Sequence, residues 1–319
     1  MANVTSERPG AARVTRSSGR RSSPSGSFRA GRRLGWLMLA PVVIAVLVIA
    51  AYPLVYTLAA SFSESTLGRP FQEWIGFDGF VEVFTDPAQF ATLWRSLVFA
   101  IPSATLALVV GFFVALSLDV AVKSGKVVRV LLLLPLMTPP VMAGVIWKLM
   151  YAPTGGLFNN LLNGTTLVTE PVLFLGTSPS AMISLIVVDV WQWAPFCVLL
   201  IYAALQTLPT EVYEAAQIDG AGVFRTFGSI TFPLIQVSLI TVFLLKVVLS
   251  FKVFDLVFIM TAGGPGLDTT VASFSIYKTA LQEFNLGTAA VQTIAFLVLV
   301  TIVITPISIY RSRLQKSEG

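Results

Sequence analysis

Six long apolar segments constrain the fold of this 319-residue chain more than any other feature. The hydrocarbon core of a bilayer is about 30 Å thick, so a helix needs about 20 apolar residues to cross it. Segments of that length lie at about residues 34–62, 96–118, 130–151, 181–205, 234–259 and 289–310. Only 12% of the residues are charged, whereas soluble proteins carry about 25%. The sequence therefore predicts an all-α membrane protein with six transmembrane helices.

The 21 basic residues are distributed unevenly between the two predicted sides of the membrane. One side receives eight Arg from the first 33 residues together with Lys123, Lys126, Arg129, Arg225, Arg311, Arg313 and Lys316. Because cytoplasmic loops carry an excess of Lys and Arg, both termini are expected in the cytoplasm. Residues 1–33 are expected to be a disordered basic tail that could contact anionic lipid. Residues 34–310 then form the six-span domain, and residues 311–319 form a second cytoplasmic tail.

The side-chain inventory argues against catalysis by this chain. There is no His, and Cys197 is the single cysteine, which excludes Ser-His-Asp and Cys-His catalysis and a disulfide framework. The run Gly263–Gly266 lacks the GK[ST] sequence of a phosphate-binding loop and is read as a tight turn. We expect no catalytic residue, no metal site, no nucleic-acid partner and no cofactor bound by this chain.

A polar segment, residues 209–233, separates the fourth and fifth apolar segments. Thr210 can cap a short helix that begins at Glu211, and Gly220 falls where a C-cap with positive φ is expected. A second short amphipathic helix then carries Phe224 and Phe227 three residues apart. From the residues alone this is a helical hairpin that lies at the membrane surface and connects two spans.

The spacing in this segment resembles, nearly position for position, the cytoplasmic coupling loop of ABC importer permeases. The matching residues are Glu214, Ala215, Ala216, Asp219, Gly220, Ala221, Ile230 and Pro233. Phe232 stands where the family usually has Leu. Residues 155–162, 191–216 and 261–270 are similar to the carbohydrate branch of these permeases. Within that branch the chain resembles the first of two non-identical permease subunits of sugar and glycerol-phosphate importers.

This resemblance implies a function and a set of partners. It implies an ATPase dimer that binds ATP and Mg, a second permease subunit, an extracytoplasmic solute-binding protein and a sugar solute, in a bacterial inner membrane. Residues 214–216 and 219–221 would contact the ATPase. Some maltose-type subunits carry a large external domain and two extra amino-terminal spans, which this sequence lacks. A glycerol phosphate or polyol solute is the near alternative, and an ATP-independent secondary transporter is the distant one.

Polar side chains within the predicted spans are candidates for the solute pathway, because charges inside a bilayer are costly and mark a pathway or an ion pair. The candidates are Asp189, Trp191, Gln192 and Trp193 in the fourth segment and Lys252 and Asp255 in the fifth. Aromatic rings with neighbouring amides and carboxylates suit a sugar. The alternative is structural, with Asp189 paired to Lys246 or Lys252. Five prolines are expected to interrupt three spans, namely Pro102, Pro135, Pro139, Pro140 and Pro195.

The first predicted external loop, residues 63–94, is rich in aromatic side chains. It contains Trp74, Phe77, Phe80, Phe84, Phe90 and Trp94. Aromatic residues gather where a membrane meets water, so an interfacial segment is one interpretation. A docking surface for an external partner is the other.

Overall fold

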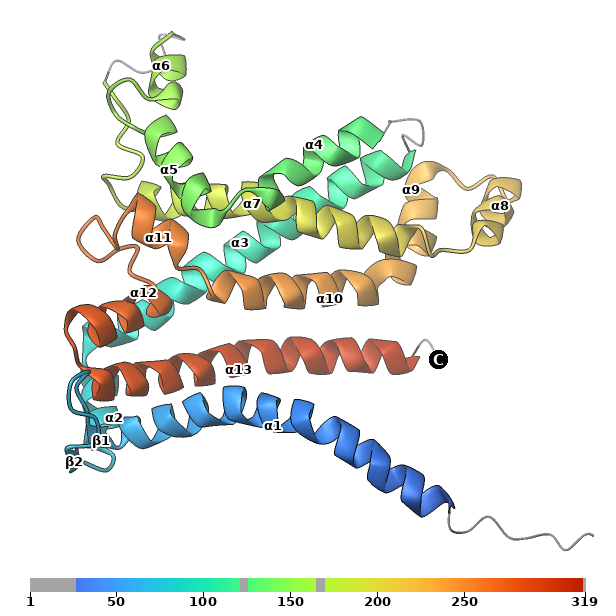
Figure 1. Ribbon diagram of the computed structural model, residues 1–319. Coiled ribbons are helices and arrows are strands. Elements are labelled where there is room, and N and C mark those ends of the chain that lie inside the picture. The colour runs from blue at the N-terminus through green and yellow to red at the C-terminus, as the bar shows by residue number, and fades with distance from the viewer. Residues whose placement is uncertain (1–26, 121–125, 165–169, 318–319) are drawn as a thin grey trace, which may run out of the picture. The chain divides into compact units, whose positions relative to one another are not determined.

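The computed structural model describes residues 27–120, 126–164 and 170–317 (Figure 1). The chain divides into two units, residues 1–55 and 56–319. The described part of the first unit is helix α1 (Ser27–Ser61) as far as residue 55. Helix α1 begins within the expected tail of residues 1–33, and residues 1–26 lie outside the described part.

The second unit is built almost entirely of helices. A two-residue antiparallel hairpin, β1 (Ser63–Glu64) and β2 (Glu73–Trp74), pairs Ser63 with Trp74 and was not predicted. The helices are α2 (Asp78–Thr85), α3 (Pro87–Val120), α4 (Lys126–Met137), α5 (Pro140–Met150), α6 (Leu157–Gly164), α7 (Ser180–Leu205), α8 (Thr210–Ile218), α9 (Val223–Thr226), α10 (Phe232–Phe251), α11 (Asp255–Met260), α12 (Ala272–Tyr277) and α13 (Leu286–Ser317). The predicted helical membrane protein is confirmed. Helix α13 also continues through most of the segment expected to be the C-terminal tail.

Five helical segments of the described chain are long and apolar enough to cross a membrane. A sixth span arises if α4 and α5 are counted as one, although the two are bent by 104°. The third predicted span is therefore broken, because Pro139 and Pro140 lack N–H donors and disfavour helical geometry in the preceding residue. By contrast, Pro102 and Pro195 lie inside continuous helices, so only one of the three expected interruptions is a break.

The fifth predicted span, residues 234–259, ends earlier than expected, and the helical segment long enough to cross a membrane is Val223–Phe251. Helix α10 ends at Phe251, and α11 begins at Asp255 after three residues outside any helix. The carbonyl of Val253, which the break releases, accepts a hydrogen bond from the hydroxyl of Ser273. This bond satisfies a backbone group that would be costly to leave unpaired in an apolar interior.

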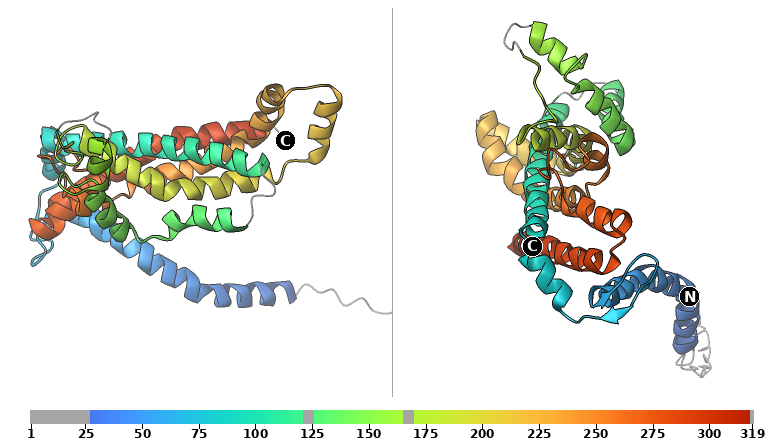
Figure 2. Two further views of the ribbon diagram at one scale, coloured as in Figure 1. Left: turned by 90° about the horizontal axis from the view of Figure 1, so that it is seen from above. Right: turned by 90° about the vertical axis from the view of Figure 1, so that its left-hand side faces the viewer.

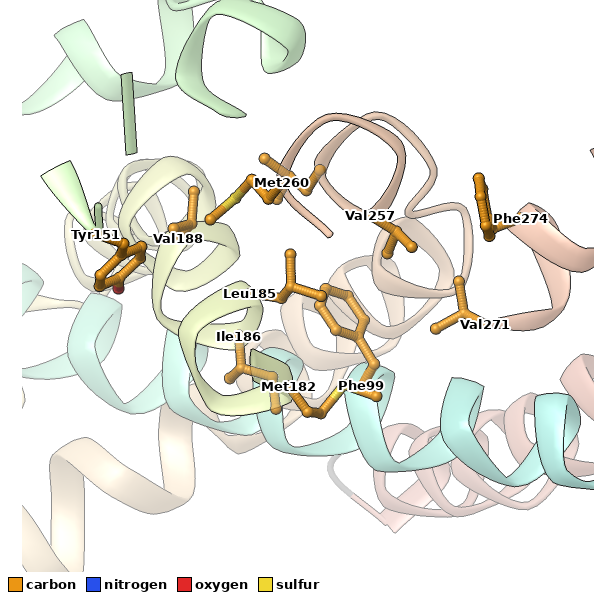
Figure 3. Close-up of a cluster of buried hydrophobic side chains, with 11 residues drawn as sticks. Phe99, Tyr151, Met182, Leu185, Ile186, Val188, Val257, Met260, Val271 and Phe274 are labelled. Carbon is orange, nitrogen blue, oxygen red and sulfur yellow. The ribbon is translucent and has the colours of Figure 1, made fainter. Parts of the chain in front are cut away.

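Helix α7 is the centre of the packing in the second unit and contacts α3, α4, α10 and α11 (Figures 1 and 2). It approaches α3 closely because Gly111 lies against Cys197, where an added Cβ would stand 2.5 Å from the Cβ of Cys197. One buried cluster joins α3, α7 and α11 through Phe99, Leu185 and Val257 (Figure 3). Cys197 is fully buried in a second cluster, as its apolar sequence context predicts.

The two ends of the second unit carry different structures (Figure 1). Helices α8 and α9 lie at one end, which we call the α8 end. The β-hairpin, α2 and α12 lie at the opposite end, which we call the α2 end (Figure 1). The position of each candidate site along the helices is described relative to these two ends.

Candidate coupling loop and buried polar site

Helix α8 ends in a tight turn at Gly220. Gly220 has φ +71°, and its N–H donates to the Gln217 carbonyl at 3.1 Å. The N–H of Ala221 donates to the Ala216 carbonyl at 2.9 Å. These two bonds are those of a Schellman motif, in which a glycine takes the left-handed position. The predicted role of Gly220 at the helix C-terminus is confirmed.

The start of α8 differs from the prediction. The helix begins at Thr210 rather than Glu211, and its N-cap residue is Pro209, with no side-chain capping bond. Pro209 has φ −68° and ψ 130°. This is the extended conformation that an N-cap residue requires, so the helix can start one residue earlier without the Thr210 hydroxyl.

The second short helix of the loop is not separate from the following span. Helix α9 passes through a π-helical turn, Phe227–Thr231, directly into α10. The ring of Phe227 packs at a tilt against that of Phe112 on α3, with centroids 5.9 Å apart, whereas Phe224 is 93% exposed. The two phenylalanines therefore do not form the single apolar face that their spacing predicted.

The side chains of α8 divide into an anchored face and an exposed face. Ala216 is buried, and the hydroxyl of Tyr213 lies 3.1 Å from that of Thr231 at the start of α10. The matching residues Glu214, Ala215, Asp219 and Gly220 are exposed, and Ala221 is partly exposed. Small side chains and carboxylates are thus presented at the α8 end, beside the apolar side chain of Ile218, which is 87% exposed.

Inside the bundle, Asp189 of α7 and Lys246 of α10 form a buried ion pair. The Lys246 Nζ lies 2.6 Å from Asp189 Oδ2, and the Lys246 and Asp189 side chains are 0% and 4% exposed. Lys246 also donates to the hydroxyl of Ser250 at 2.7 Å, and lies 3.5 Å from that of Ser103 on α3. Ser103 in turn donates to the same carboxylate oxygen. The pair therefore links three spans, and Asp189 pairs with Lys246 rather than Lys252.

Two further candidates on α7 face the same interior. The ring of Trp193 lies under Lys246, with 5.7 Å between Nζ and the ring centroid. This distance is within the range of a cation–π interaction. Gln192 is buried and donates from Nε2 to the Thr138 carbonyl at 2.9 Å, at the break between α4 and α5.

Trp191 points elsewhere. It is 37% exposed, and its ring packs edge to face on Trp147 of α5 at 5.5 Å. Trp147 continues into a cluster with Tyr151 and with Phe158 of α6, at centroid distances of 5.5 and 5.7 Å. Of the four candidates in α7, Asp189, Gln192 and Trp193 therefore face the interior of the bundle. Trp191 instead belongs to an aromatic cluster with side chains of α5 and α6.

Lys252 and Asp255, which were expected within one continuous span, do not share a helical face, because the break after α10 separates them. Lys252 is exposed at the C-cap of α10, and Asp255 is the first residue of α11. Beyond the break, α11 packs on α5, and the Lys148 Nζ donates to the Ile259 carbonyl at 2.9 Å.

Three residues that form side-chain hydrogen bonds in these sites were not identified from the sequence. Ser250 could have been found, because it lies one helical turn after Lys246 and can share its face. Ser103 and Lys148 gave no such signal, since their partners are 86 and 111 residues away in the sequence.

The architecture defines a class of membrane protein. Residues 96–315 match the family of binding-protein-dependent transport system inner membrane components, and the chain belongs to this family. It is a permease subunit of an ABC importer and not an enzyme. The fold is also that of a bacterial ABC transporter involved in the import of the acidic polysaccharide alginate, with TM-score 0.79, 23% identity, and coverage of 90% of this chain and 98% of that one.

Among characterised relatives, the chain is similar to the trehalose/maltose transport system permease protein MalF of Thermococcus litoralis. The two are 33% identical over 285 residues, which cover 88% of this chain and 95% of the relative. The sulfoquinovosyl glycerol transport system permease protein SmoG of Agrobacterium fabrum is 33% identical over 259 residues, covering 80% and 83%. The sn-glycerol-3-phosphate transport system permease protein UgpA of Yersinia enterocolitica is 31% identical over 231 residues, covering 72% and 77%.

Proposed function

We propose that this permease subunit imports a saccharide or glycoside and that a separate ATPase drives it through α8. The observation that carries the proposal is the α8 turn, where a Schellman motif at Gly220 fixes an exposed row of small and acidic side chains. Glu214, Ala215, Asp219, Gly220 and Ala221 would form the coupling surface, and the buried Ala216 would hold α8 from beneath. Tyr213 and Thr231 would pass movement of α8 to α10 through their hydroxyl contact.

The orientation follows from charge. The α8 end would be cytoplasmic, with both termini on that side, because 15 of the 21 Lys and Arg residues fall in the sequence segments assigned to the side of the α8 loop. The partners would be an ATPase dimer that holds ATP and Mg at the α8 end, a second permease subunit within the membrane, and a solute-binding protein at the α2 end. This chain itself would bind no cofactor.

The solute pathway would use polar and aromatic groups near the middle of the spans. Trp191, with its exposed ring, is the candidate for direct contact with solute. Asp189, Gln192 and Trp193 would shape the pathway from behind, since each is engaged with Lys246 or Thr138. Lys252 and Asp255 would line it at the break between α10 and α11.

A saccharide is favoured over a phosphate ester as solute. Two of the relatives named above are transport proteins for trehalose/maltose and sulfoquinovosyl glycerol. A glycerol phosphate is the second candidate, because UgpA is a similar relative. Lys246 is already neutralised by Asp189, so among the proposed pathway residues only Lys252 would supply a cation for an anionic solute.

A matched pair of glycine variants tests the coupling role in the transporter reconstituted with its co-purifying subunits. Gly220→Val forces a β-branched residue to φ +71°, at a cost of about 1–2 kcal/mol. Gly222→Val is the control, because Gly222 has φ −71° and an added Cβ at either position meets no atom within 4 Å. We expect Gly220→Val to reduce saccharide-stimulated ATP hydrolysis and uptake about tenfold or more, and Gly222→Val to leave both unchanged. Equal activity of the two variants would contradict the coupling role.

A further inference from the structure

A groove between α3 and α7 at the α2 end takes part in none of the sites above. It has a volume of about 510 Å³, within the range of small-molecule binding sites. Most of its lining is apolar, from Val98, Pro102 and Leu106 of α3 and Met182, Ile186 and Val187 of α7. Leu106 and Val187 are exposed, so the groove opens on the side of the bundle.

The groove lies in the half of the bundle beyond the break in the third span. In the half toward the α8 end, α4 packs along α7 (Figure 1), and Leu132 and Leu133 line a small cavity there together with Pro195 and Val198. At Pro140 the chain turns by 104°, and α5 packs mainly on α11, while it keeps a smaller contact with α7 through Trp147 and Trp191. Beyond the bend, neither α4 nor α5 contributes a residue to the lining of the groove.

The length of the groove matches one leaflet of a bilayer. Its α3 wall extends from Trp94 to Leu106, which is about 18 Å at 1.5 Å per residue. Half of a bilayer core is about 15 Å. An apolar slot of this length on a transmembrane helix pair fits a single acyl chain.

The mouth of the groove carries two opposite charges that do not pair with each other. Arg95 lines it, and its Nη1 is buried without a hydrogen-bond partner among the described residues. Asp268, from the turn after α11, lines the same mouth, and the two side chains are not within 4.0 Å of each other. Trp94 lies beside Arg95 and is 61% exposed, as is typical of an aromatic side chain at the membrane–water interface.

We propose that this groove binds one zwitterionic phospholipid with a primary ammonium group, phosphatidylethanolamine, from the leaflet at the α2 end. One acyl chain fills the apolar slot. The phosphate pairs with the guanidinium of Arg95, whose side chain is partly exposed and lines the groove, and the ammonium donates to the Asp268 carboxylate. Two separated charges of opposite sign complement this headgroup better than phosphatidylglycerol, which lacks the ammonium, or phosphatidylcholine, whose quaternary ammonium cannot donate.

Native mass spectrometry of the complete transporter tests the site. The complex is purified in mild detergent and supplied separately with dioleoyl phosphatidylethanolamine, phosphatidylcholine and phosphatidylglycerol. We expect retention of one phosphatidylethanolamine per copy of this chain, with weaker retention of the other two lipids. Arg95→Gln should weaken retention about tenfold, as expected when a charge-assisted hydrogen bond is lost. Asp268→Asn should remove the preference for phosphatidylethanolamine over phosphatidylcholine.

Two control variants distinguish lipid in the groove from lipid bound elsewhere and from a neighbouring subunit that covers the groove. Arg69→Gln removes an exposed arginine of the loop after β1, outside the groove, and should change nothing. Val187→Cys places a thiol in the groove wall for cross-linking within the complete transporter. Equal retention of the three lipids, unchanged retention in Arg95→Gln, or a cross-link from Val187→Cys to another subunit would each overturn the proposal. None of these readouts depends on transport or ATP hydrolysis.

Discussion

Replacing Lys246 with Met should destabilise the protein strongly, and replacing Asp189 at the same time should restore most of the loss. In the single variant, the Asp189 carboxylate keeps only the Ser103 hydroxyl as a partner, in a site where its side chain is 4% exposed. Removing one member of a buried ion pair costs about 3–5 kcal/mol, because the other charge stays buried and uncompensated. Asp189→Asn alone leaves a buried ammonium and should cost a similar amount.

The double variant Asp189→Asn/Lys246→Met contains neither charge. The new amide can still bond with the Ser103 hydroxyl, and Met approximates the volume of the lysine stem. Replacement of a whole buried pair by neutral groups is often close to neutral. We therefore expect the double variant to be at least about 3 kcal/mol more stable than the sum of the two single effects predicts.

Thermal unfolding of the purified transporter, followed by intrinsic fluorescence in mild detergent, measures these differences. One kcal/mol shifts the Tm of a chain of 319 residues by about 1.5 °C, so each single variant should melt about 5–7 °C lower. Lys252→Met is the matched control, because Lys252 is exposed, and it should shift the Tm by about 2 °C or less. A wild-type Tm for Lys246→Met, or additive losses in the double variant, would refute the reasoning.

Two further predictions concern packing and the α8 loop. Gly111→Ala should destabilise the α3–α7 contact by about 1–3 kcal/mol, since its Cβ would stand 2.5 Å from that of Cys197; Gly228→Ala, where an added Cβ meets nothing within 4 Å, is the thermal-unfolding control. Tyr213→Phe removes the hydroxyl contact with Thr231 and should speed hydrogen exchange of the α8 amides about two- to tenfold. Unchanged exchange in α8 would show that this contact does not hold the helix.

The local features of this fold were predictable from the sequence, and the long-range ones were not. The apolar segments and the turn at Gly220 depend on residues close together in the chain, so hydrophobicity and backbone preference were enough to find them. The spacing of residues in the sequence could not show whether Lys246 or Lys252 pairs with Asp189. It depends on where α10 ends, and that end is fixed by tertiary contacts such as the Ser273 hydroxyl on the Val253 carbonyl.

The prolines show the same division between local and tertiary causes. Pro102 and Pro195 remain inside α3 and α7, whereas Pro139 and Pro140 separate α4 from α5. A proline pair removes two successive N–H donors, so it requires external partners for the carbonyls that it releases. At the break itself, the Thr138 carbonyl lies just before the start of α5 and accepts a hydrogen bond from Gln192.

That bond connects the break to the buried ion pair. Gln192 lies one helical turn after Asp189 on α7, and Ser250, which accepts a hydrogen bond from Lys246, lies one residue before the end of α10. The third and fifth spans therefore both break at the level of a single polar layer, in which side chains satisfy backbone groups that a continuous helix would satisfy itself. An apolar replacement of the ion pair could thus preserve stability, whereas Gln192→Leu would leave the Thr138 carbonyl without its amide donor at the bend.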